Sequence, residues 1–516
     1  MRISVLIRFL LVVLLASALT GFSQSSARAE RSTSEQGPTG GDRDYFGNLQ
    51  FRNLGPAVAG GRVTAVLGVP GHPEIYYAGT AAGGVFKSED GATNWRYISA
   101  GIPAPSVGAM AIAPGNPNLI WVGTGEANLR NDIITGHGVF FSPDAGASWR
   151  AMGLEDAGQI ANIVVSPANP ETVFVAAFGH AWGPNGERGV FRSTDAGHTW
   201  KKVLYIDDKT GASDLVMDPS NPMILYAGMW QAQRYPWMMA SGGTTSGIYR
   251  STDGGETWQK LSAGLPRPPV GRIGLAVAPS NPKHVYALVE SKDGVLWDSS
   301  DYGEHWTKVS DNYLINARPF YFGHLFVAPK DEHKIYFLSF DVVLSIDGGK
   351  TARIISRGVH ADHHALWIDP EDPNRLIEGN DGGVYTSWNG GQTWQFRDSL
   401  PIEQFYSVAL DGRTPYMLCG GLQDNSGWCG PSQTLSRGPI ANNEWWTTVG
   451  GDGQYVVPAT KGSNLIYSDS QYGEIEALDR ETGERRHIRP YMLSQGDMEL
   501  SQLKYRFNWT SPIAVS

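Results

Sequence analysis

The sequence predicts an all-β protein, a β-propeller built from four-stranded antiparallel blades. One eight-residue motif, Ser-x-Asp-x-Gly-x-Thr-Trp, returns seven times between residues 88 and 394. The last positions of successive copies stand 54, 51, 58, 48, 46 and 42 residues apart. Such a period is typical of a propeller blade. Between the copies, short β-rich runs alternate with turn residues, and no helical period competes with them.

The repeated motif predicts a strand, a tight turn and another strand. The Asp carboxylate can accept backbone N–H bonds inside the turn, and Gly supplies the positive φ of the reversal. The Trp that follows is expected to bury its ring between neighbouring blades. The sixth copy ends in Ala instead of Trp. The copies are residues 88–95, 142–149, 193–200, 251–258, 299–306, 345–352 and 387–394.

A second motif, resembling Pro-x-Asn-Pro, precedes five of the seven copies. Each example lies between an apolar run and a β-rich run, so it indicates a hairpin turn between the first and second strands of a blade. A blade is then expected to contain an inner strand, this turn, a second strand, a loop, a third strand that ends at Ser-x-Asp, and a fourth strand after the Trp. The turns are residues 113–117, 166–170, 218–222, 278–282 and 369–373.

The repeats divide the chain into residues 45–400, with seven blades, and a divergent part, residues 401–516. In the second part, residues 405–408 with 416–420 indicate an eighth blade, and residues 455–457 with 465–468 a ninth. Residues 511–516 resemble the opening strand of a tenth. Either this last strand closes the ring on the first blade, or the chain belongs to a longer tandem propeller.

The N-terminus predicts export. Arg2 and Arg8 flank an apolar run, residues 9–19, that is too short to span ~30 Å of hydrocarbon. An A-x-A site ends at Ala29, so residues 1–29 are expected to be a signal peptide and residues 30–44 a disordered lead-in. The expected location is secreted or periplasmic, with no membrane span once the signal is removed.

Charge and cysteine content agree with an exported protein. Removing residues 1–29 deletes three Arg, so 41 − 3 = 38 basic residues face 51 acidic ones, and 38 − 51 gives a formal charge of −13. An acidic balance argues against nucleic acid as a partner. Cys419 and Cys429 are the two cysteines. In an oxidising compartment a disulfide between them is favoured over two free thiols.

The eight-residue motif resembles the Asp-box, or BNR repeat. The chain is therefore similar to Asp-box propellers, which include sialidases, xyloglucanase-type glycoside hydrolases, photosystem II assembly propellers and sortilin. The strongest resemblance is to large bacterial secreted proteins described as sortilin-like or as glycosyl hydrolase-like. It covers residues 50 to 400 and is specific for fold, whereas it says little about activity.

Propeller topology predicts where a site would lie. Loops between second and third strands, and loops that enter an inner strand, emerge on one face, opposite the Asp-box turns, and irregular loops usually carry function. A glycosidase needs two carboxylates ~5 to 9.5 Å apart. Carboxylates expected on this face are Glu126, Asp132, Glu187, Asp362, Asp381, Asp424 and Asp452. Among them Asp381, Asp424 and Glu126 are the catalytic candidates, although acids in Gly-rich turns are more often turn formers.

The same loops offer groups that could bind a ligand. Trp230, Arg234, Tyr235 and Trp237 form an aromatic and basic patch suited to a sugar or a peptide, or alternatively fold over the propeller rim. His180, Trp182 and His363 are further candidates. His360, Asp362 and His364 contain enough donors for a metal, but the spacing is not a known ligand pattern, so an ordinary loop is favoured. No metal and no cofactor are predicted.

Two functions remain open at this point. The resemblance to xyloglucanase-type enzymes implies a catalytic Asp in the first propeller, but Ala81 occupies the matching position of Gly79-Thr80-Ala81-Ala82-Gly83-Gly84. The sialidase signature is also only faintly matched, by residues 51–54. The favoured prediction is therefore an exported, sortilin-like binding or scaffold propeller for a peptide, protein or glycan. The alternative is a glycoside hydrolase, xyloglucanase-like or sialidase-like, that uses carboxylates of the loop face.

Overall fold

The computed structural model describes residues 52–54, 60–459, 463–490 and 499–515. The chain separates into two compact units, Met1–Asn53 and Leu54–Ser516, and the description below concerns the second. The predicted signal peptide and lead-in lie outside the described residues. No helix within the described ranges is long and apolar enough to cross a membrane.

The second unit contains nine antiparallel sheets, each with four strands in sequential order, and the fourth sheet carries one additional strand. The first strands of the sheets are β1 (Val63–Val69), β5 (Val107–Ile112), β9 (Gln159–Val165), β13 (Thr210–Met217), β18 (Ile273–Val277), β22 (His324–Ala328), β26 (His363–Ile368), β30 (Phe405–Leu410) and β34 (Val456–Pro458). The second strands are β2 (His72–Thr80), β6 (Ile120–Thr124), β10 (Val173–Gly179), β14 (Leu225–Tyr235), β19 (Val285–Val289), β23 (Asp331–Leu338), β27 (Leu376–Asn380), β31 (Met417–Leu422) and β35 (Leu465–Ser470).

The third and fourth positions of each sheet are occupied by the strands that follow in sequence, and most of these are shorter than the first two. The third strands are β3 (Val85–Ser88), β7 (Val139–Ser142), β11 (Gly189–Ser193), β16 (Gly247–Ser251), β20 (Leu296–Ser299), β24 (Val342–Ser345), β28 (Gly383–Ser387), β32 (Gly427–Pro431) and β36 (Glu474–Asp479). The fourth strands are β4 (Arg96–Tyr97), β8 (Arg150–Ala151), β12 (Lys201–Leu204), β17 (Gln259–Lys260), β21 (Thr307–Ser310), β25 (Arg353–Ile354), β29 (Gln395–Phe396), β33 (Trp446–Thr447) and β37 (Arg485–His487). The additional strand is β15 (Met238–Ser241).

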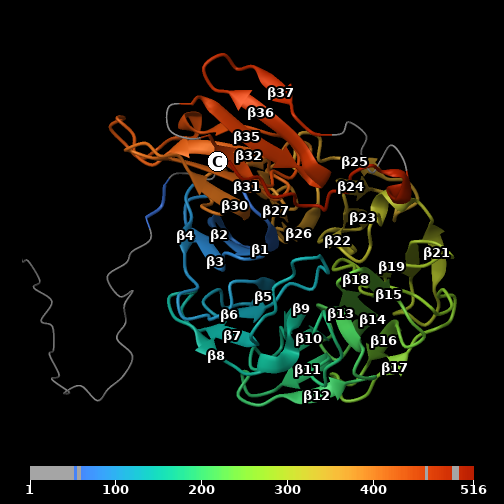
Figure 1. Ribbon diagram of the computed structural model, residues 1–516. Coiled ribbons are helices and arrows are strands. Elements are labelled where there is room, and N and C mark those ends of the chain that lie inside the picture. The colour runs from blue at the N-terminus through green and yellow to red at the C-terminus, as the bar shows by residue number, and fades with distance from the viewer. Residues whose placement is uncertain (1–51, 55–59, 460–462, 491–498, 516) are drawn as a thin grey trace, which may run out of the picture. The chain divides into compact units, whose positions relative to one another are not determined.

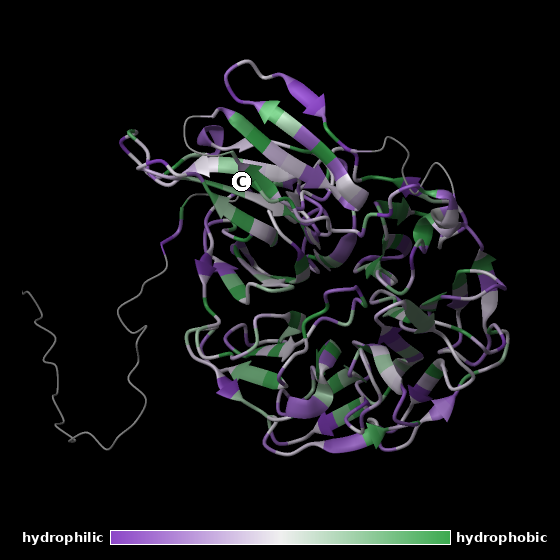
Figure 2. Cartoon of the chain, viewed as in Figure 1, coloured by the Kyte–Doolittle hydropathy of each residue, from purple (hydrophilic) through white to green (hydrophobic). Residues whose placement is uncertain are grey.

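Short 3-10 helices complete the regular structure. They are η1 (Glu155–Ala157), η2 (Tyr313–Ile315), η3 (Asn442–Glu444), η4 (Gln471–Gly473) and η5 (Leu500–Gln502). The predicted all-β fold of four-stranded blades is therefore confirmed, and the predicted turns join first to second strands as expected. The hydrophilic outermost strands contrast with the apolar inner ones (Figure 2).

Seven sheets follow one another around a ring, from β1 to β29 (Figure 1). The inner strands β1, β5, β9, β13, β18, β22 and β26 each contact the next, and β26 also contacts β1. The ring is thus closed by the seventh sheet against the first. Residues 511–515 form no strand, so the alternative in which a final strand closes the ring is wrong. The eighth and ninth sheets contact each other through β30 and β34.

All seven motif turns share one hydrogen-bonding pattern. The Ser hydroxyl donates to the side chain of the third residue at 2.7 to 3.0 Å. The same hydroxyl accepts the N–H of the fifth residue. The third residue accepts the N–H of the seventh, including Asn389, which replaces Asp in the last copy. The turn is therefore fixed locally, whichever residues surround it.

The motif Trp rings are less buried than expected. Trp149, Trp200, Trp258 and Trp394 are half-buried, whereas Trp306 is fully buried. Three of the half-buried rings, those of Trp149, Trp200 and Trp394, donate their Nε1–H to a backbone carbonyl of the preceding sheet: the carbonyls of Ile98, Met152 and Ile355, respectively, at 2.6 to 2.9 Å. A buried indole N–H usually finds a hydrogen-bond partner, and these three rings find theirs at the rim of the interface between sheets. They join adjacent sheets but do not fill the centre of the core.

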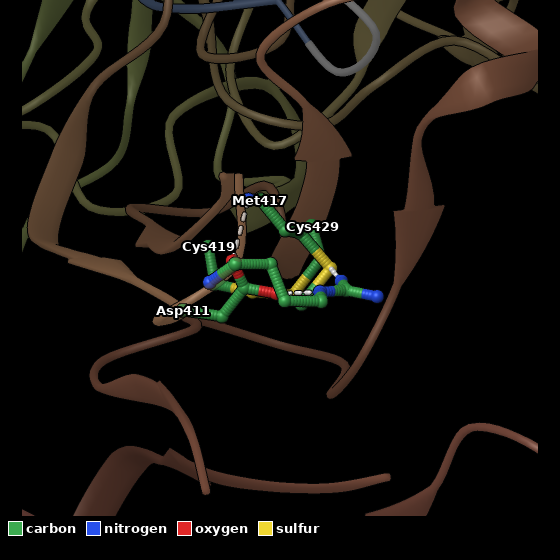
Figure 3. The surroundings of a disulfide bond; sticks show 5 residues. Asp411, Met417, Cys419 and Cys429 are labelled. Atoms are coloured by element: carbon green, nitrogen blue, oxygen red, sulfur yellow. Dashed lines mark hydrogen bonds and ion pairs between the residues drawn. A yellow bond between two sulfur atoms is a disulfide. The ribbon is translucent and has the colours of Figure 1, made fainter. Parts of the chain in front are cut away.

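The eighth sheet contains a disulfide between Cys419 and Cys429 (Figure 3). The two residues face each other on β31 and β32. Their Cα atoms are 4.1 Å apart, which is shorter than the ~4.4 to 6.8 Å range of common disulfides. Directly opposed residues of antiparallel strands approach to about 4.5 Å where they exchange no backbone hydrogen bonds, so the strand register explains the short distance.

Candidate functional site

A cluster of buried polar residues gathers around Arg62, immediately before β1. Gly60 has a φ of +77°, and a Cβ atom there would lie 1.9 Å from the carbonyl oxygen of Gly382. Glycine therefore allows this segment to pack directly against the loop between β27 and β28. Asp381 belongs to that loop, and the close backbone approach places it beside Arg62.

Arg62 uses its whole guanidinium group. Its Nε and Nη2 donate to the two oxygens of Asp381 at 2.8 and 2.7 Å. Nη2 also contacts Asp424 Oδ2 at 2.8 Å, and Nη1 donates to Gln404 Oε1 at 2.8 Å. The Arg62 side chain is only 2 % exposed. One buried cation therefore joins the first, seventh and eighth sheets of the second unit.

Asp381 is held as an anion. Burial favours the neutral form of its carboxyl, but Arg62 and His364 outweigh burial and hold the pKa well below its usual range. His364 Nε2 lies 2.7 Å from Asp381 Oδ1, and the Tyr321 hydroxyl donates to Oδ2 at 2.7 Å. The side chain of Asp381 is 1 % exposed. This carboxylate is thus fully occupied by protein partners.

Asp424 has the opposite character. Burial, together with the negative charge of Asp381, raises the pKa of Asp424 to about 8, although Arg62 acts in the other direction. Its side chain is 28 % exposed, so the carboxyl reaches the surface. The backbone N–H of Asp424 donates to Asp452 Oδ1 at 2.8 Å, which fixes the loop after β31. At neutral pH this carboxyl can hold a proton and donate it.

A second acidic group lies across Gln404 from this pair. Gln404, which accepts from Arg62, donates through Nε2 to Asp132 Oδ2 at 3.0 Å. Asp132 also forms an ion pair with Arg130, and its side chain is 42 % exposed. Arg130 in turn bonds Glu126 at 2.5 Å. The cluster therefore presents a proton-holding carboxyl, Asp424, and an exposed carboxylate, Asp132, on either side of Arg62 and Gln404.

The three catalytic candidates from the sequence come together here, but in different roles. Asp381 and Asp424 both bond Arg62 Nη2. Glu126 is 0 % exposed and lies close enough to act electrostatically on Arg62 and Tyr321. Asp381 and Glu126 are buried among protein partners, so only Asp424 among these three reaches the surface.

Several predicted ligand-binding residues lie elsewhere. Trp230 is fully buried against Phe178, with ring centroids 5.2 Å apart, so its ring offers no face to a ligand. His363 is fully buried in β26, where Nδ1 lies 2.5 Å from Glu378 Oε1. His180 forms a pair with Asp156 at 2.9 Å. These positions correct the expectation that Trp230 and His363 face the loop surface: both belong to strands and point into the core.

The rest of the aromatic patch is exposed on a hairpin. β14 continues beyond its blade and pairs with β15, and Tyr235 and Trp237 lie on this extension with ring centroids 5.8 Å apart. Trp237 is 78 % exposed and Trp182 is 42 % exposed. Arg234 N–H donates to the carbonyl of Ala181, which ties the hairpin to the loop of Trp182. The hairpin thus offers a surface of aromatic rings.

The residues considered for a metal make other contacts. His364 bonds Asp381, His360 Nε2 lies 3.1 Å from the carbonyl oxygen of Asp424, and Asp362 pairs with Arg318 at 3.5 Å. Across the described parts of the chain, no group of three His, Cys, Asp or Glu side chains is arranged to hold a metal ion.

Sequence reasoning missed the residues that organise the cluster. Arg62, Tyr321 and Gln404 carry the contacts but belong to no motif. One signal was present: Arg62 follows a glycine and immediately precedes an inner strand, a place where a side chain enters the loop face. Ala81 lies beside the cluster, in the wall of a cavity of about 210 Å³ that Arg62 and Gln404 also line.

Parts of the chain are similar to a sortilin family model and to xyloglucanases. A family model described as sortilin, neurotensin receptor 3 matches residues 137–267. A xyloglucanase of Acetivibrio thermocellus is 28% identical over 267 residues, which cover 49% of this chain and 27% of that protein. An oligoxyloglucan-reducing end-specific xyloglucanase of Emericella nidulans is 24% identical over 379 residues, covering 68% of this chain and 41% of that protein. The chain thus spans less than half the length of these relatives.

Solved structures share the fold. An ancestral GH74 enzyme superposes with a TM-score of 0.58 at 19% identity, covering 84% of this chain and 62% of that one. The Niastella koreensis GH74 enzyme gives a TM-score of 0.52 at 17% identity, covering 84% and 73%. Because the curated relatives are xyloglucanases, the prediction of a binding or scaffold protein is wrong, and the glycoside hydrolase alternative fits better.

Proposed function

We propose that this protein is an exported glycoside hydrolase that acts on a β-glucan of the xyloglucan class. The observation that carries the proposal is the pair of carboxyl groups on Arg62: one is a buried anion, and the other reaches the surface with a raised pKa. Glycosidases separate two carboxyl groups in this way, so that one can protonate the leaving oxygen at neutral pH.

Asp424 is the proposed general acid. Its pKa of about 8 keeps it protonated at pH 7, and its partial exposure lets a glycosidic oxygen approach. Asp381 supports this state, because its fixed negative charge 2.7 Å from Arg62 Nη2 disfavours a second charge on Asp424. Asp381 is a positioning residue in this scheme, since its own oxygens are occupied by Arg62, His364 and Tyr321.

Asp132 is the proposed partner carboxylate. Arg130 and Gln404 hold it as a hydrogen-bonded anion, and its side chain is 42 % exposed. It comes from the loop between β6 and β7, while Asp424 comes from the loop between β31 and β32. Arg62 and Gln404 link the two carboxyl groups through hydrogen bonds, and both carboxyl side chains are partly exposed to an approaching glycan. In this proposal, Asp424 and Asp132 supply the two carboxyl groups, although Ala81 occupies the position where the resemblance to xyloglucanases implies a catalytic Asp.

The substrate class rests on the curated relatives and on the exposed aromatic rings. The relatives are named as xyloglucanases. Trp182, Tyr235 and Trp237 offer apolar faces on which sugar rings can stack. A glycan is accordingly the proposed partner, and secretion would bring the enzyme to a polymer that cannot enter the cell.

The test is hydrolysis of xyloglucan by the secreted full-length chain, followed as new reducing ends. Asp424→Asn should lower turnover about a hundredfold or more, since a positioned general acid contributes about 10²- to 10⁴-fold. The loss should be much smaller on a dinitrophenyl glycoside of a xyloglucan oligosaccharide, because that leaving group needs no proton. Asp132→Asn should lower turnover of both substrates.

Asp311→Asn is the matched control, because Asp311 is 80 % exposed and lies outside the cluster. It should leave turnover unchanged. If the unmodified chain releases no reducing ends from xyloglucan or related β-glucans, the proposal fails. Equal turnover by Asp424→Asn and the unmodified chain on the polymer would remove Asp424 from its role.

A further inference from the structure

A second carboxyl group lies directly behind the proposed general acid. Asp424 follows β31, whereas Asp452 lies in the segment between β33 of the eighth sheet and β34 of the ninth. The backbone N–H of Asp424 donates to Asp452 Oδ1 at 2.8 Å. Asp452 is 4 % exposed, so no glycan reaches its carboxyl directly. Asp452 therefore touches the acid loop without any role of its own in the proposed chemistry.

The backbone fixes these two segments against each other. Ser426 N–H donates to the carbonyl of Gly451 at 2.8 Å. A Cβ atom on Gly453 would lie 2.4 Å from the carbonyl oxygen of Ser426, so glycine permits the close approach. Asp424 has a φ of +61°, a left-handed conformation that Asp adopts more readily than most residues. The contact between Asp424 and Asp452 is thus built into the two loops.

Three carboxyl groups share the surroundings of one guanidinium. Asp381 and Asp424 both bond Arg62 Nη2, and Asp452 adds a third acid on the far side of Asp424. Within the described part of the chain, no Lys, Arg or His forms an ion pair with Asp452. Carboxylates this close disfavour a further negative charge, so one of the three groups is expected to keep a proton at neutral pH.

The hydrogen bonds indicate that this proton belongs to Asp424. Asp452 Oδ1 accepts the Asp424 N–H, and the Tyr406 hydroxyl lies 3.5 Å from Oδ2. Donors that face a carboxylate favour its charged form. Among the described residues, the carboxyl oxygens of Asp424 accept a hydrogen bond from Arg62 alone, and Arg62 is shared with Asp381. After burial and Asp381, the charge of Asp452 and a bond between the two side chains further raise the pKa of Asp424 to about 8.

The other titratable groups around the acid do not take this role. Burial raises the pKa of Tyr406, so its hydroxyl stays neutral and can donate. His360 Nε2 lies 3.1 Å from the carbonyl oxygen of Asp424 and not at its carboxyl. Asp132 is paired with Arg130. The two buried aspartates thus remain the negative charges that act on the acid.

We propose that Asp452 is a positioning residue of the hydrolytic site, which keeps the proton on Asp424 and fixes the loop that carries it. This inference rests on the proposed role of Asp424 as the general acid. The charge of Asp381 is offset by Arg62, whereas Asp452 has no such cation. Without the charge of Asp452, Asp424 would release its proton at lower pH, and the site would lose its acid near neutrality.

The test compares two changes at one residue. Asp452→Asn removes the charge, but the amide oxygen can still accept the Asp424 N–H, whereas Asp452→Ala removes both. On xyloglucan, the alkaline limb of kcat/KM for Asp452→Asn should move to lower pH by about 1 pH unit or more, as a neighbouring charge commonly shifts a carboxyl pKa by about 1 to 3. Turnover at pH 5 should stay within about twofold. Asp452→Ala should lower turnover at pH 5 as well, because the loop is no longer fixed.

Asp411→Asn is the matched control. Asp411 also accepts a backbone N–H in the eighth sheet, that of Met417 at 2.7 Å, but it lies in the turn between β30 and β31 (Figure 3). This variant should leave the alkaline limb in place. A limb that moves equally in Asp411→Asn and Asp452→Asn would overturn the assignment to Asp452.

A direct titration separates this inference from the proposed function. ¹³C NMR of the full chain with labelled aspartate, assigned through Asp424→Asn, follows the Asp424 carboxyl without any turnover. Its midpoint should lie near pH 8 in the unmodified chain and at least about 1 pH unit lower in Asp452→Asn. A midpoint that moves in a chain without hydrolysis would contradict the proposed function but not the effect of Asp452 on the proton.

Two results would overturn the inference itself. One is a midpoint, or an alkaline limb, that Asp452→Asn leaves unchanged. The other is a midpoint near pH 4 in the unmodified chain, which would show that Asp424 holds no proton at neutral pH. The second result does not require Asp452→Asn to fold.

Discussion

Arg62 and Arg272 occupy the same place in two sheets, yet their surroundings differ. Each follows a glycine and immediately precedes an inner strand, β1 or β18. Arg62 bonds two carboxyl groups and a tyrosine hydroxyl, whereas Arg272 bonds an amide, a carbonyl and an imidazole. The repeat thus delivers a guanidinium to the loop-face end of an inner strand twice, and the neighbouring loops decide its partners.

The direction in which the pKa of each arginine shifts follows from those partners. Burial disfavours both cations, but Asp381 and other acids outweigh it at Arg62 and raise the pKa of Arg62 well above its usual value. At Arg272 burial dominates, and its pKa falls to about 10. A buried arginine is therefore an ion-pair partner in one sheet and a cation bonded to neutral groups in the other. The place of an arginine immediately before an inner strand therefore does not determine whether its partners are charged or neutral.

Removing each arginine should separate the two regions most clearly. Arg62→Met leaves Asp381 as a buried carboxylate without its main partner, so the free energy of unfolding should fall by about 3 to 5 kcal/mol. Arg272→Met removes a poorly compensated charge and three bonds to neutral groups, so its loss should be about 1 to 2 kcal/mol. Urea unfolding at pH 7 measures both. Equal losses would contradict the difference in charge compensation.

The sequence predicted the fold because the determinants are local and repeated. The Ser hydroxyl and the Asp carboxylate close each turn within eight residues, as at Ser142 and Asp144, so a short motif specifies where a third strand ends. The hydrophobic strands between such turns can then pair with the strands that precede and follow them in the sequence. The number of sheets in the ring could not be read in the same way, since closure depends on the contact of β26 with β1.

The candidate site was predicted only in part, because its contacts are long-range. Loop position identified Asp381 and Asp424, but the partners of Arg62 lie 319 and 362 residues away in the chain. The opposite roles of the two acids depend on burial, which the sequence does not encode locally. Trp230 was misplaced for the same reason: β14 extends beyond its blade, so a residue expected in a loop lies inside a strand.

The pH dependence of stability should sharpen the contrast around Arg62. The pKa of Asp424 is raised to about 8 in the folded state, above an unfolded value of about 3.9, so the folded state holds more protons between these values. Stability therefore falls as pH rises from about 4 to about 8. Asp424→Asn removes this dependence while Asn can still accept from Arg62.

We expect the free energy of unfolding of Asp424→Asn to rise relative to that of the unmodified chain by up to about 1 kcal/mol for each pH unit between pH 5 and pH 8. This figure is below the full linkage value because the carboxyl of Asp424 is partly exposed. Asp381 gives stability the opposite pH dependence. Because its pKa is lowered in the folded state, it contributes stability above about pH 4, and this stability is lost as the pH falls further. Thermal unfolding at several pH values measures both. A constant difference between Asp424→Asn and the unmodified chain would contradict the raised pKa.

A further expected effect concerns a loop that contacts both arginines. Phe320 gives its carbonyl to Arg272, and the adjacent Tyr321 gives its hydroxyl to Arg62 and Asp381. Tyr321→Phe removes the hydroxyl from the charged pair and leaves the backbone bond to Arg272 intact. Because a bond to a charged group contributes about 1.5 to 3 kcal/mol, the variant should lose about that much stability, while Tyr97→Phe at a half-exposed ring should lose less than about 0.5 kcal/mol. Urea unfolding at pH 7 measures both variants, and a loss in Tyr321→Phe as small as that in Tyr97→Phe would mean that the hydroxyl does not stabilise the charged pair.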